Sequence, residues 1–384
     1  MGGSGVIPGW KIAREFDRFV QQIKAVIGLT WEPVVQWRYD RNRVTLTRII
    51  STGQSPLDKI AIYLIFQPKG LCISTLETCR ILARQGYSVL IVSNGQLAEN
   101  DIALLRDQVW AVLIRPNYGY DFGGYRDGIL HLFDVRADPA KLLVMNDSIW
   151  FPTGPEDTLL PRMEASGIDV TGTVVHRSHR SKTRQGFGSR VIESYFFLFD
   201  RHAVRSECFR SFWQRYRLSS NKYNAVYRGE RKITEEMRKG GLTADGLFGR
   251  EDFMTALEQQ DSEFLRKTLF YAAYTDDVFR AEGEALLSEP VDAQNWRANV
   301  IDHIRRVTLK RNFHGAFVFA SMTLLDMPFL KKGTGTFLKR TYGTLYTRMR
   351  ERYLAAVMAG DLPRPRSEVI DEIVQRDGVK LDPH

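Results

Sequence analysis

Short apolar runs alternate with amphipathic stretches over the first half of the chain. Each run is four to seven residues long, as expected for strands that are buried on both faces of a sheet. The stretches between them place apolar residues at helical spacing, as in Thr75–Gly86. This alternation predicts βαβ units and a mostly parallel α/β sheet flanked by helices. The strand candidates are Ile60–Phe66, Ser88–Ser93, Ala111–Ile114, Leu142–Met145, Asp169–Val175 and Tyr195–Phe199.

The pattern is different on both sides of this core. Residues 6–50 are helical in pattern and rich in tryptophan, and the chain after residue 201 is mostly helical. The expected helices there are Arg201–Arg217, a helix that follows residues 229–233 and runs to Lys239, and helices at 253–257, 264–271 and 342–357. We therefore predict a helical N-terminal extension over residues 1–57, an α/β core over 58–275, and a mostly helical C-terminal region over 276–384 that completes the site.

Three polar residues, Asn146, Asp147 and Ser148, follow the strand predicted at Leu142–Met145. Ligands bind at the carboxyl ends of strands in open α/β sheets, so we expect Asp147 to face a cleft with room for a diphosphate. A carboxylate there can hold a divalent cation that bridges two phosphates. The alternative is that Asp147 and Ser148 only cap the next segment.

A glycine-containing loop precedes the helix expected from Phe122. It holds Asn117, Gly119 and Asp121, and its glycines allow close approach of backbone to a ligand. The spacing excludes a dinucleotide fingerprint, and no Gly-Lys-Ser/Thr follows as in a P-loop. Asp121 could hold sugar hydroxyls or a base edge, or it could cap the helix.

The chain carries a formal net charge of +9. This excess suits an anionic partner such as a phosphorylated donor or an acidic membrane surface, or it reflects an ordinary solvated surface. The segment 176–190 is especially basic and could close over phosphates. Its two histidines, His176 and His179, have no third ligand beside them, so zinc is not expected. The basic residues form no recognised nucleic-acid module.

Glu230 stands just before a predicted helix, where a carboxylate could deprotonate an attacking hydroxyl. Glu193, Glu235 and Glu236 compete for this role, and each could equally be a surface charge. The three cysteines are too few for a disulfide framework and, with no secretory signal, indicate a reducing, cytoplasmic location. The apolar run 313–330 contains polar residues and a proline, so it is not expected to span a membrane. Peripheral association at the inner face of the membrane stays open.

Several motifs in order resemble the rhamnan synthesis protein F family. They are RPNYGYDFGGYRDGI, LLVMNDSIWFP, ESYFFLFDR, GERKITEEMRKGG and NFHGAFVFASMTLLDMPFLKK, and the resemblance covers roughly residues 58–332. The family is similar to glycosyltransferases of the GT-A type. The resemblance implies transfer of a sugar, best matched by L-rhamnose from dTDP-L-rhamnose, to a bacterial surface polysaccharide or lipid-linked glycan. Related transferases have Asp-x-Asp where this chain has Asn146-Asp147-Ser148, so only Asp147 remains as a ligand for Mg²⁺ or Mn²⁺.

The resemblance also suggests roles for residues of this chain. Direct displacement would invert the anomer and needs a base, which we assign to Glu230, while Asp147 orients the donor. His314 and Lys331 would contact the diphosphate or brace the site from the far end. A different interpretation is a non-catalytic subunit that binds the glycan or the nucleotide sugar. The donor pocket would be lined by Asn117, Gly119, Asp121, Asn146 and Ser148.

Overall fold

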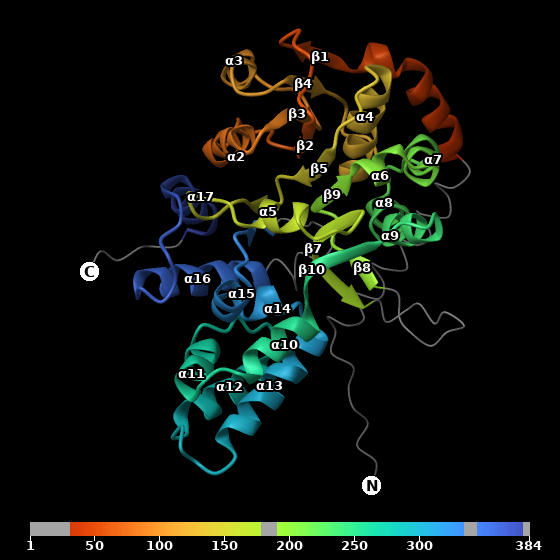
Figure 1. Cartoon of the computed structure of the whole chain (residues 1–384). Helices are drawn as coiled ribbons and strands as arrows, with labels where there is room; N and C mark the ends of the chain where they lie inside the picture. Colours follow the sequence, from red (N-terminus) through yellow and green to blue (C-terminus); the bar gives the residue numbers. More distant parts are fainter. Residues whose placement is uncertain (1–30, 178–189, 334–343, 379–384) are drawn as a thin grey trace.

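The computed structural model describes residues 31–177, 190–333 and 344–378. Its centre is a mixed sheet in the order β1-β4-β3-β2-β5-β9-β7-β10, with β8 paired to β7 (Figure 1). The strands are β1 (Arg48–Ser51), β2 (Lys59–Ile65), β3 (Tyr87–Ser93), β4 (Ala111–Ile114), β5 (Lys141–Asn146), β7 (Val170–Arg177), β8 (Arg190–Ile192), β9 (Phe196–Asp200) and β10 (Ala244–Gly249). The predicted α/β class is confirmed.

The strands of this sheet run mostly in one direction. β2, β3, β4, β5, β7 and β10 are parallel, whereas β1, β8 and β9 run against them. β9 lies between β5 and β7, with Met145 opposite Phe196 and Lys141 opposite Asp200. Because β9 is reversed, the residues before it reach the edge of the sheet where β5 ends. This reversal was not expected from the sequence.

Alternate residues of the central strands enter two hydrophobic clusters on opposite faces of the sheet. In β2, Ala61, Tyr63 and Ile65 pack into one cluster, and the residues between them pack into the other. The first cluster is covered by α2 (Ile73–Arg84), α3 (Glu99–Arg106) and α5 (Leu159–Glu164). The second is covered by α4 (Tyr120–Asp134), α7 (Glu207–Arg215) and α9 (Glu230–Lys239). Both faces are therefore buried, as the apolar runs predicted.

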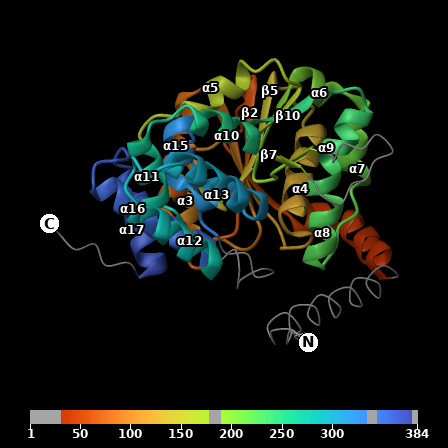
Figure 2. The ribbon, with the colours of Figure 1, turned by 90° about the horizontal axis from the view of Figure 1, so that it is seen from below.

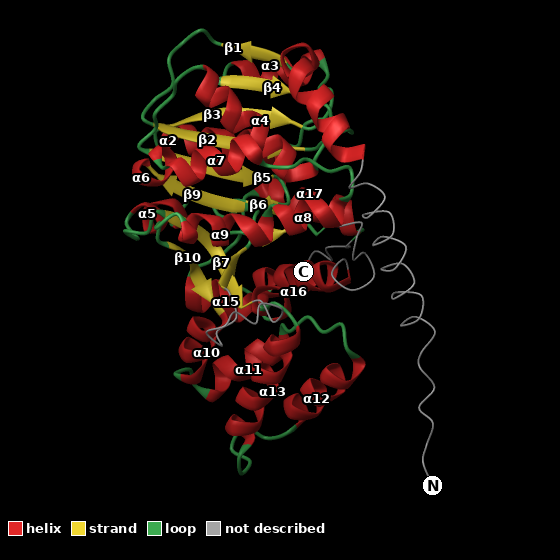
Figure 3. Ribbon diagram, turned by 90° about the vertical axis from the view of Figure 1, so that its right-hand side faces the viewer, coloured by secondary structure: helices red, strands yellow, loops and turns green. Residues whose placement is uncertain are grey.

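The C-terminal helices extend the first cluster away from the sheet (Figures 1 and 3). Core residues such as Phe253, Ile304 and Ile373 belong to the same cluster as Tyr63. The division at residue 276 stays a prediction, because apolar packing is continuous across it. The helices are α10 (Arg250–Glu258), α11 (Ser262–Phe270), α12 (Asp277–Ser288), α13 (Trp296–Lys310), α14 (Phe313–Ala316), α15 (Val318–Leu325), α16 (Thr344–Met358) and α17 (Ser367–Asp377).

A second, two-stranded sheet joins the C-terminal region to the end of β5. β6 (Ile149–Trp150) pairs antiparallel with β11 (Leu330–Lys331), which places Lys331 opposite Ile149. The backbone N–H of Lys332 also donates to the carbonyl of Ser148 at 2.8 Å. We refer to Asn146, Asp147 and Ser148, which follow the main part of β5, as the tip. Backbone hydrogen bonds therefore hold the end of the tip and β6 against β11 and Lys332, far along the chain.

Two parts of the predicted helical pattern differ in the structure. The helix predicted at Arg201–Arg217 divides into α6 (Arg201–Arg205) and α7, because the Ser206 hydroxyl accepts from the Phe209 N–H at 3.2 Å and begins a new helix. Strand β10 lies in a region predicted to be helical.

The N-terminal segment is tied to the main sheet. Residues 31–46 form a helix, and β1 then pairs antiparallel with β4. The Tyr39 hydroxyl of this helix donates to Asp127 in α4 at 2.5 Å. Residues 6–30 of the stretch predicted to be helical, which include Trp10, Phe16 and Ile23, lie outside the described residues. Among the described residues, no helix is long and apolar enough to cross a membrane.

Candidate active site

The tip after β5 is organised by the side chain of Asn146, which is 4% exposed. Its amide Oδ1 accepts from the backbone N–H of Ser148 at 3.1 Å and from the Ser148 hydroxyl at 2.6 Å. Its Nδ2 donates to Asp121 Oδ2 at 3.3 Å. Asn146 thus fixes the turn and joins it to the first turn of α4.

Asp147 is half-buried at the same edge. Its Oδ2 accepts from the backbone N–H of Phe66 at 3.0 Å and from the Gln67 amide at 3.1 Å, both just beyond β2. These donors hold the carboxylate in one orientation beside the end of the neighbouring strand. Asp147 does not cap the following segment through these bonds, which instead tie its carboxylate to the residues that follow β2.

Asp121 is solvent-accessible but surrounded by protein on most sides. Desolvation raises its pKa to about 6; the charge of Lys222 opposes this shift, whereas the carboxylates of Asp147 and Glu230 add to it. The charges that act on Asp121 show that Lys222, Asp147 and Glu230 lie within electrostatic range of it.

Glu230 is the first residue of α9. Its Oε2 accepts a hydrogen bond from the Ser194 hydroxyl at 2.8 Å. Desolvation raises the pKa of Glu230, and the Ser194 hydrogen bond offsets only part of this shift. The preceding residue, Gly229, has no room for a side chain, because a Cβ there would lie 2.4 Å from the Phe122 ring. The start of α9 is thereby packed directly against α4.

Glu193 holds two residues from the C-terminal region. Its Oε1 lies 3.5 Å from His314 Nε2, and its Oε2 lies 3.9 Å from Lys331 Nζ. Desolvation alone would raise the pKa of Glu193, but the charges of His314, Lys331 and His176 and the His314 hydrogen bond outweigh it and lower the pKa to about 2. Glu193 is therefore an anion that positions its neighbours, in contrast to Glu230.

Lys331 is the positively charged residue beside Glu193. Its Nζ lies 3.2 Å from the centroid of the Tyr195 ring. Desolvation lowers the pKa of Lys331 to about 8, although the carboxylates of Glu193, Glu230 and Asp121 oppose the shift. A small cavity lies beside Lys331. Its lining consists of His314, Val318, Ser321, Met322, Met327, Phe329, Leu330, Lys331 and Met349.

Helix α17 braces the strand that carries Lys331. Glu372 accepts from the Ser74 hydroxyl and the Trp150 indole, each at 2.7 Å, and lies 3.6 Å from Lys332 Nζ. The neighbouring Arg350 donates to the Lys331 carbonyl at 3.1 Å. These contacts fix β11 against α2 and β6, so the position of Lys331 depends on the last described helix.

Packing within the fold explains why glycine occupies positions 119 and 123 of the 117–124 loop. Gly119 adopts φ 85°, and a Cβ there would lie 2.6 Å from the Leu218 side chain. A Cβ on Gly123 would lie 2.2 Å from the Tyr118 carbonyl oxygen. Their absent side chains allow the loop to fold on itself. Asn117 is exposed in the same loop.

Behind the loop, a buried ion pair anchors α4. Arg115 Nε donates to Asp127 Oδ2 at 2.6 Å, and both side chains are fully buried. Arg115 also donates to the Tyr118 carbonyl at 2.5 Å and to the side chain of Asn94. Together with the Tyr39 hydroxyl, these bonds hold the loop that leads to Asp121.

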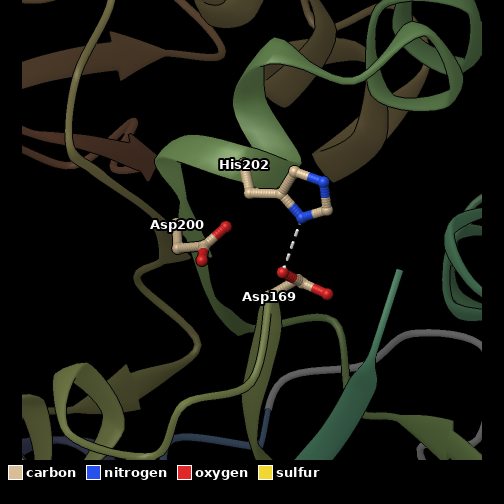
Figure 4. A group of neighbouring side chains, drawn as sticks. All are labelled: Asp169, Asp200 and His202. Atoms are coloured by element: carbon tan, nitrogen blue, oxygen red, sulfur yellow. Dashed lines mark hydrogen bonds and ion pairs between the residues drawn. The ribbon is translucent and has the colours of Figure 1, made fainter. Parts of the chain in front are cut away.

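Among the described residues, one group of three acids and histidines is close enough to share an ion, and it lies away from the tip (Figure 4). Asp169 precedes β7 and Asp200 ends the reversed β9, so this group occupies the opposite edge of the sheet. Asp169 Oδ2 accepts from the Thr243 N–H and hydroxyl, each at 2.7 Å, and Asp200 caps α6. His202 lies 2.9 Å from Asp169. These carboxylates are occupied in holding β10 and α6.

The basic segment 176–190 lies almost entirely outside the described residues, including His179, Arg180, Lys182 and Arg184. His176 is described and exposed at the end of β7. Its charge lowers the pKa of Glu193 and opposes the raised pKa of Glu230. This places the start of the segment next to the acidic group.

Sequence reasoning did not identify Ser194, Tyr195 or Lys222, because their relevance depends on the reversed direction of β9 and on the position of α8 (Lys222–Arg228). The competing bases Glu235 and Glu236 are partly exposed and pair with lysines on their own helix. The contacts are Lys232–Glu235 at 2.9 Å, Lys239–Glu235 at 2.8 Å and Lys239–Glu236 at 3.1 Å.

Comparisons with known proteins agree with the motifs. A curated relative, the uncharacterized protein y4gN of Sinorhizobium fredii, is 29% identical over 352 residues, which are 84% of this chain and 88% of that protein. Two solved mannosyltransferases overlap loosely with the structure. The Pyrobaculum calidifontis enzyme in complex with GDP-Man and Mn²⁺ has a TM-score of 0.32 and 11% identity, with 88% of this chain and 98% of that chain covered.

The second is the S. cerevisiae mannosyltransferase Ktr4p, with a TM-score of 0.25, 10% identity, and 48% of this chain and 66% of that chain covered. Overlaps of this size assign neither a donor nor a metal to the present chain. The family comparison is more specific. The model described as rhamnan synthesis protein F matches residues 89–275, which include the glycine loop, the tip, Glu193 and Glu230, and so confirms the resemblance to this family that the motifs indicated.

Proposed function

We propose that this chain is a glycosyltransferase of the GT-A type. It takes a sugar from a nucleoside diphosphate donor and transfers it to a glycan acceptor. The match to rhamnan synthesis protein F supports L-rhamnose as the sugar and dTDP-L-rhamnose as the donor. The acceptor is then a growing surface polysaccharide or a lipid-linked glycan.

The observation that carries this proposal is the convergence of acids and cations at one edge of the sheet. Asp121, Asp147 and Glu230 come from three separate elements, and Lys331 arrives from the C-terminal region. Sugar transfer needs a base for the acceptor hydroxyl and positive charge near the departing diphosphate. Both kinds of group are present here within electrostatic range of one another.

Glu230 is the base in this proposal. Its raised pKa makes it a better proton acceptor than an ordinary carboxylate, and the Ser194 hydroxyl orients it. Glu193 is unsuited to the task because its pKa is about 2 and its oxygens face His314 and Lys331. One base opposite the leaving group implies direct displacement, with inversion at the anomeric carbon.

The donor lies along the tip and the glycine loop. Lys331 and His314 contact the diphosphate from the C-terminal side, where positive charge stabilises the leaving group. Asp147 and Asp121 orient the sugar hydroxyls. The remaining donor contacts are Asn117, Gly119, Asn146 and Ser148.

A divalent cation fits this site only as a loosely held, hydrated ion. Asp147 offers one carboxylate, whose Oδ2 already accepts two hydrogen bonds, and Mg²⁺ or Mn²⁺ keeps several waters when few protein ligands are present. When bound, such an ion would neutralise charge on the diphosphate. Lys331 and His314 supply part of the same charge without it.

The test is donor turnover by the full-length protein. A panel of nucleotide sugars is incubated with the protein, with and without glycan acceptor and with Mg²⁺ or Mn²⁺, and release of nucleoside diphosphate is measured. We expect release from one donor, with dTDP-L-rhamnose the fastest. Glu230→Gln should abolish it, and Glu235→Gln, a partly exposed residue of the same helix, should not. Equal turnover by both variants would refute Glu230 as the base.

A second candidate function is a non-catalytic subunit that binds the nucleotide sugar or the glycan. The single acid at the tip favours it, since Asp147 Oδ2 is engaged by Phe66 and Gln67. A binding subunit would be stabilised by its ligand without consuming it, in proportion to affinity. A donor that raises the melting temperature while no diphosphate is released under any metal condition would support this function over transfer.

A further inference from the structure

The helix of residues 31–46 exposes a large apolar surface. Trp31 is 69% exposed, Trp37 60% and Val44 82%, and Val34 and Val35 beside them are about half exposed. Tryptophan is usually well buried in folded proteins, so two exposed indoles on one short helix mark a surface that binds something. We refer to these five residues as the N-terminal apolar face.

The opposite side of the helix is firmly held by the domain. Glu32 Oε2 lies 2.8 Å from Arg228 Nη2, and Asp40 Oδ1 lies 2.6 Å from Arg126 Nη1. The Tyr39 hydroxyl reaches the buried Arg115–Asp127 pair. The helix is therefore anchored to the domain by one side, and the N-terminal apolar face is exposed on its other side.

The charges of this helix are sorted by side. Its two acids, Glu32 and Asp40, both turn toward arginines of the domain. Arg38 and Arg41 stay exposed, and Arg41 lies 5.5 Å from the centre of the Trp37 ring. Among the described residues, no acid forms an ion pair with either arginine. The outer side thus combines tryptophan and valine with the two exposed arginines.

We propose that the N-terminal apolar face, with Arg38 and Arg41, docks on an anionic lipid bilayer. Indole rings favour the region between headgroups and acyl chains, and arginine is attracted to anionic headgroups. A second copy of the chain fits less well. A two-fold contact through this face would bring the arginines of one copy toward those of the other, and like charges oppose such an interface.

The helix that carries the docking face packs against the loop that leads to Asp121. The helix runs next to α8, as Figure 2 shows, and Gln36 donates to the Tyr216 carbonyl at 3.0 Å. The Tyr39 ring contacts the ring of Tyr118, at 5.2 Å between centroids, in the loop that leads to Asp121. A bilayer bound to this face would therefore lie near the loop. The inference stands on the helix itself and does not require the proposed transferase activity.

The experiment is co-sedimentation of the full-length chain with vesicles. One set contains phosphatidylcholine alone, and the other contains phosphatidylcholine with phosphatidylglycerol. We expect binding to the anionic vesicles that weakens as salt is raised. Trp31→Ala with Trp37→Ala, and separately Arg38→Glu with Arg41→Glu, should each weaken binding by about tenfold or more. The melting temperature without vesicles should stay unchanged.

Matched controls come from distant surfaces. Phe270→Ala with Val278→Ala removes exposed apolar side chains from α11 and α12, and Arg84→Glu with Arg106→Glu reverses exposed charges on α2 and α3. Controls that weaken binding as much as the face variants would overturn the proposal, as would wild-type protein that ignores anionic vesicles. A face variant that changes the oligomeric state or the melting temperature while binding vesicles normally would assign this face to a protein contact.

Discussion

Glu193 Oε1 and His314 Nε2 lie 3.5 Å apart although 121 residues separate them in the chain. The other oxygen of Glu193 lies 3.9 Å from Lys331 Nζ. One carboxylate thus connects the sheet edge to two elements of the C-terminal region. This connection gives Glu193 a role in holding the two regions together and leaves the proposed proton transfer to Glu230.

Glu193→Gln should destabilise the protein at neutral pH. The folded pKa of Glu193 is about 2, below its ordinary value of 4.5, so its contribution is fully present above pH 4.5 and is lost as pH falls through about 2. We expect a loss of about 2–3 kcal/mol at pH 7, measured by urea unfolding. The variant should also show a flatter dependence of stability on pH between 4.5 and 2.

The matched control is Glu236→Gln, which removes a partly exposed glutamate paired with Lys239 on its own helix. Surface pairs of this kind contribute little, so its unfolding free energy should stay within about 1 kcal/mol of wild type. If Glu193→Gln unfolds at the same urea concentration as this control at every pH, the carboxylate does not join the two regions.

Lys331 makes a different prediction, about donor binding. Its pKa is lowered to about 8, so its positive charge is present below pH 8 and is lost as pH rises through that value. The affinity for a nucleoside diphosphate should therefore fall between pH 7 and pH 9. Lys331→Arg, which stays charged, should keep its affinity over this range, whereas Lys331→Met should bind weakly at both ends. Calorimetric titration at each pH is the measurement.

The strands of the core could be predicted from the sequence because their burial is local information. The runs at Ala111–Ile114 and Leu142–Met145 are apolar at every position, as expected for strands that are covered on both faces of the sheet. The position of Asp147 at the carboxyl edge followed from the end of that second run. These features depend on residues that are close together in the sequence, so they can be predicted from it.

The rest of the site depends on contacts that sequence spacing does not encode. The direction of β9 brings Ser194 and Tyr195 to the edge, and the pairing of β6 with β11 brings Lys331 there. Strand β10 was missed because Ala244–Gly249 contains no β-branched residue and two glycines. Its strand conformation comes from parallel pairing with β7, which is a tertiary constraint.

Asp147→Asn tests the tip with little change of shape. The asparagine oxygen can still accept from the Phe66 N–H, so the melting temperature should stay near that of wild type. The lost negative charge should lower donor turnover by at least about a hundredfold, because the group that orients the donor is changed. The control is Asp101→Asn, an acid in the first turn of α3. Donor turnover is compared with and without Mn²⁺, and a variant that keeps full turnover would remove Asp147 from the site.

The buried pair behind the glycine loop should be costly to break. Asp127→Ala leaves the Arg115 guanidinium buried without its carboxylate, and such changes cost about 3–5 kcal/mol. Tyr39→Phe removes one hydrogen bond to the same carboxylate and should cost only about 1 kcal/mol. Urea unfolding of both variants gives the comparison. Equal costs would mean that the ion pair adds nothing beyond an ordinary hydrogen bond.

Glu230 provides the sharpest prediction about chemistry. A general base works only when ionised, so turnover should fall as pH drops below its pKa, which burial raises above the ordinary carboxyl value. Ser194→Ala removes a hydrogen bond that favours the ionised form, and it should shift this acidic limb to higher pH while leaving the rate on the plateau less affected. Asp121 titrates nearby at about 6, so Asp121→Asn is needed to assign the limb. Removing that negative neighbour should move the limb to lower pH if Glu230 is the titrating base. A limb that disappears in Asp121→Asn would instead assign it to Asp121.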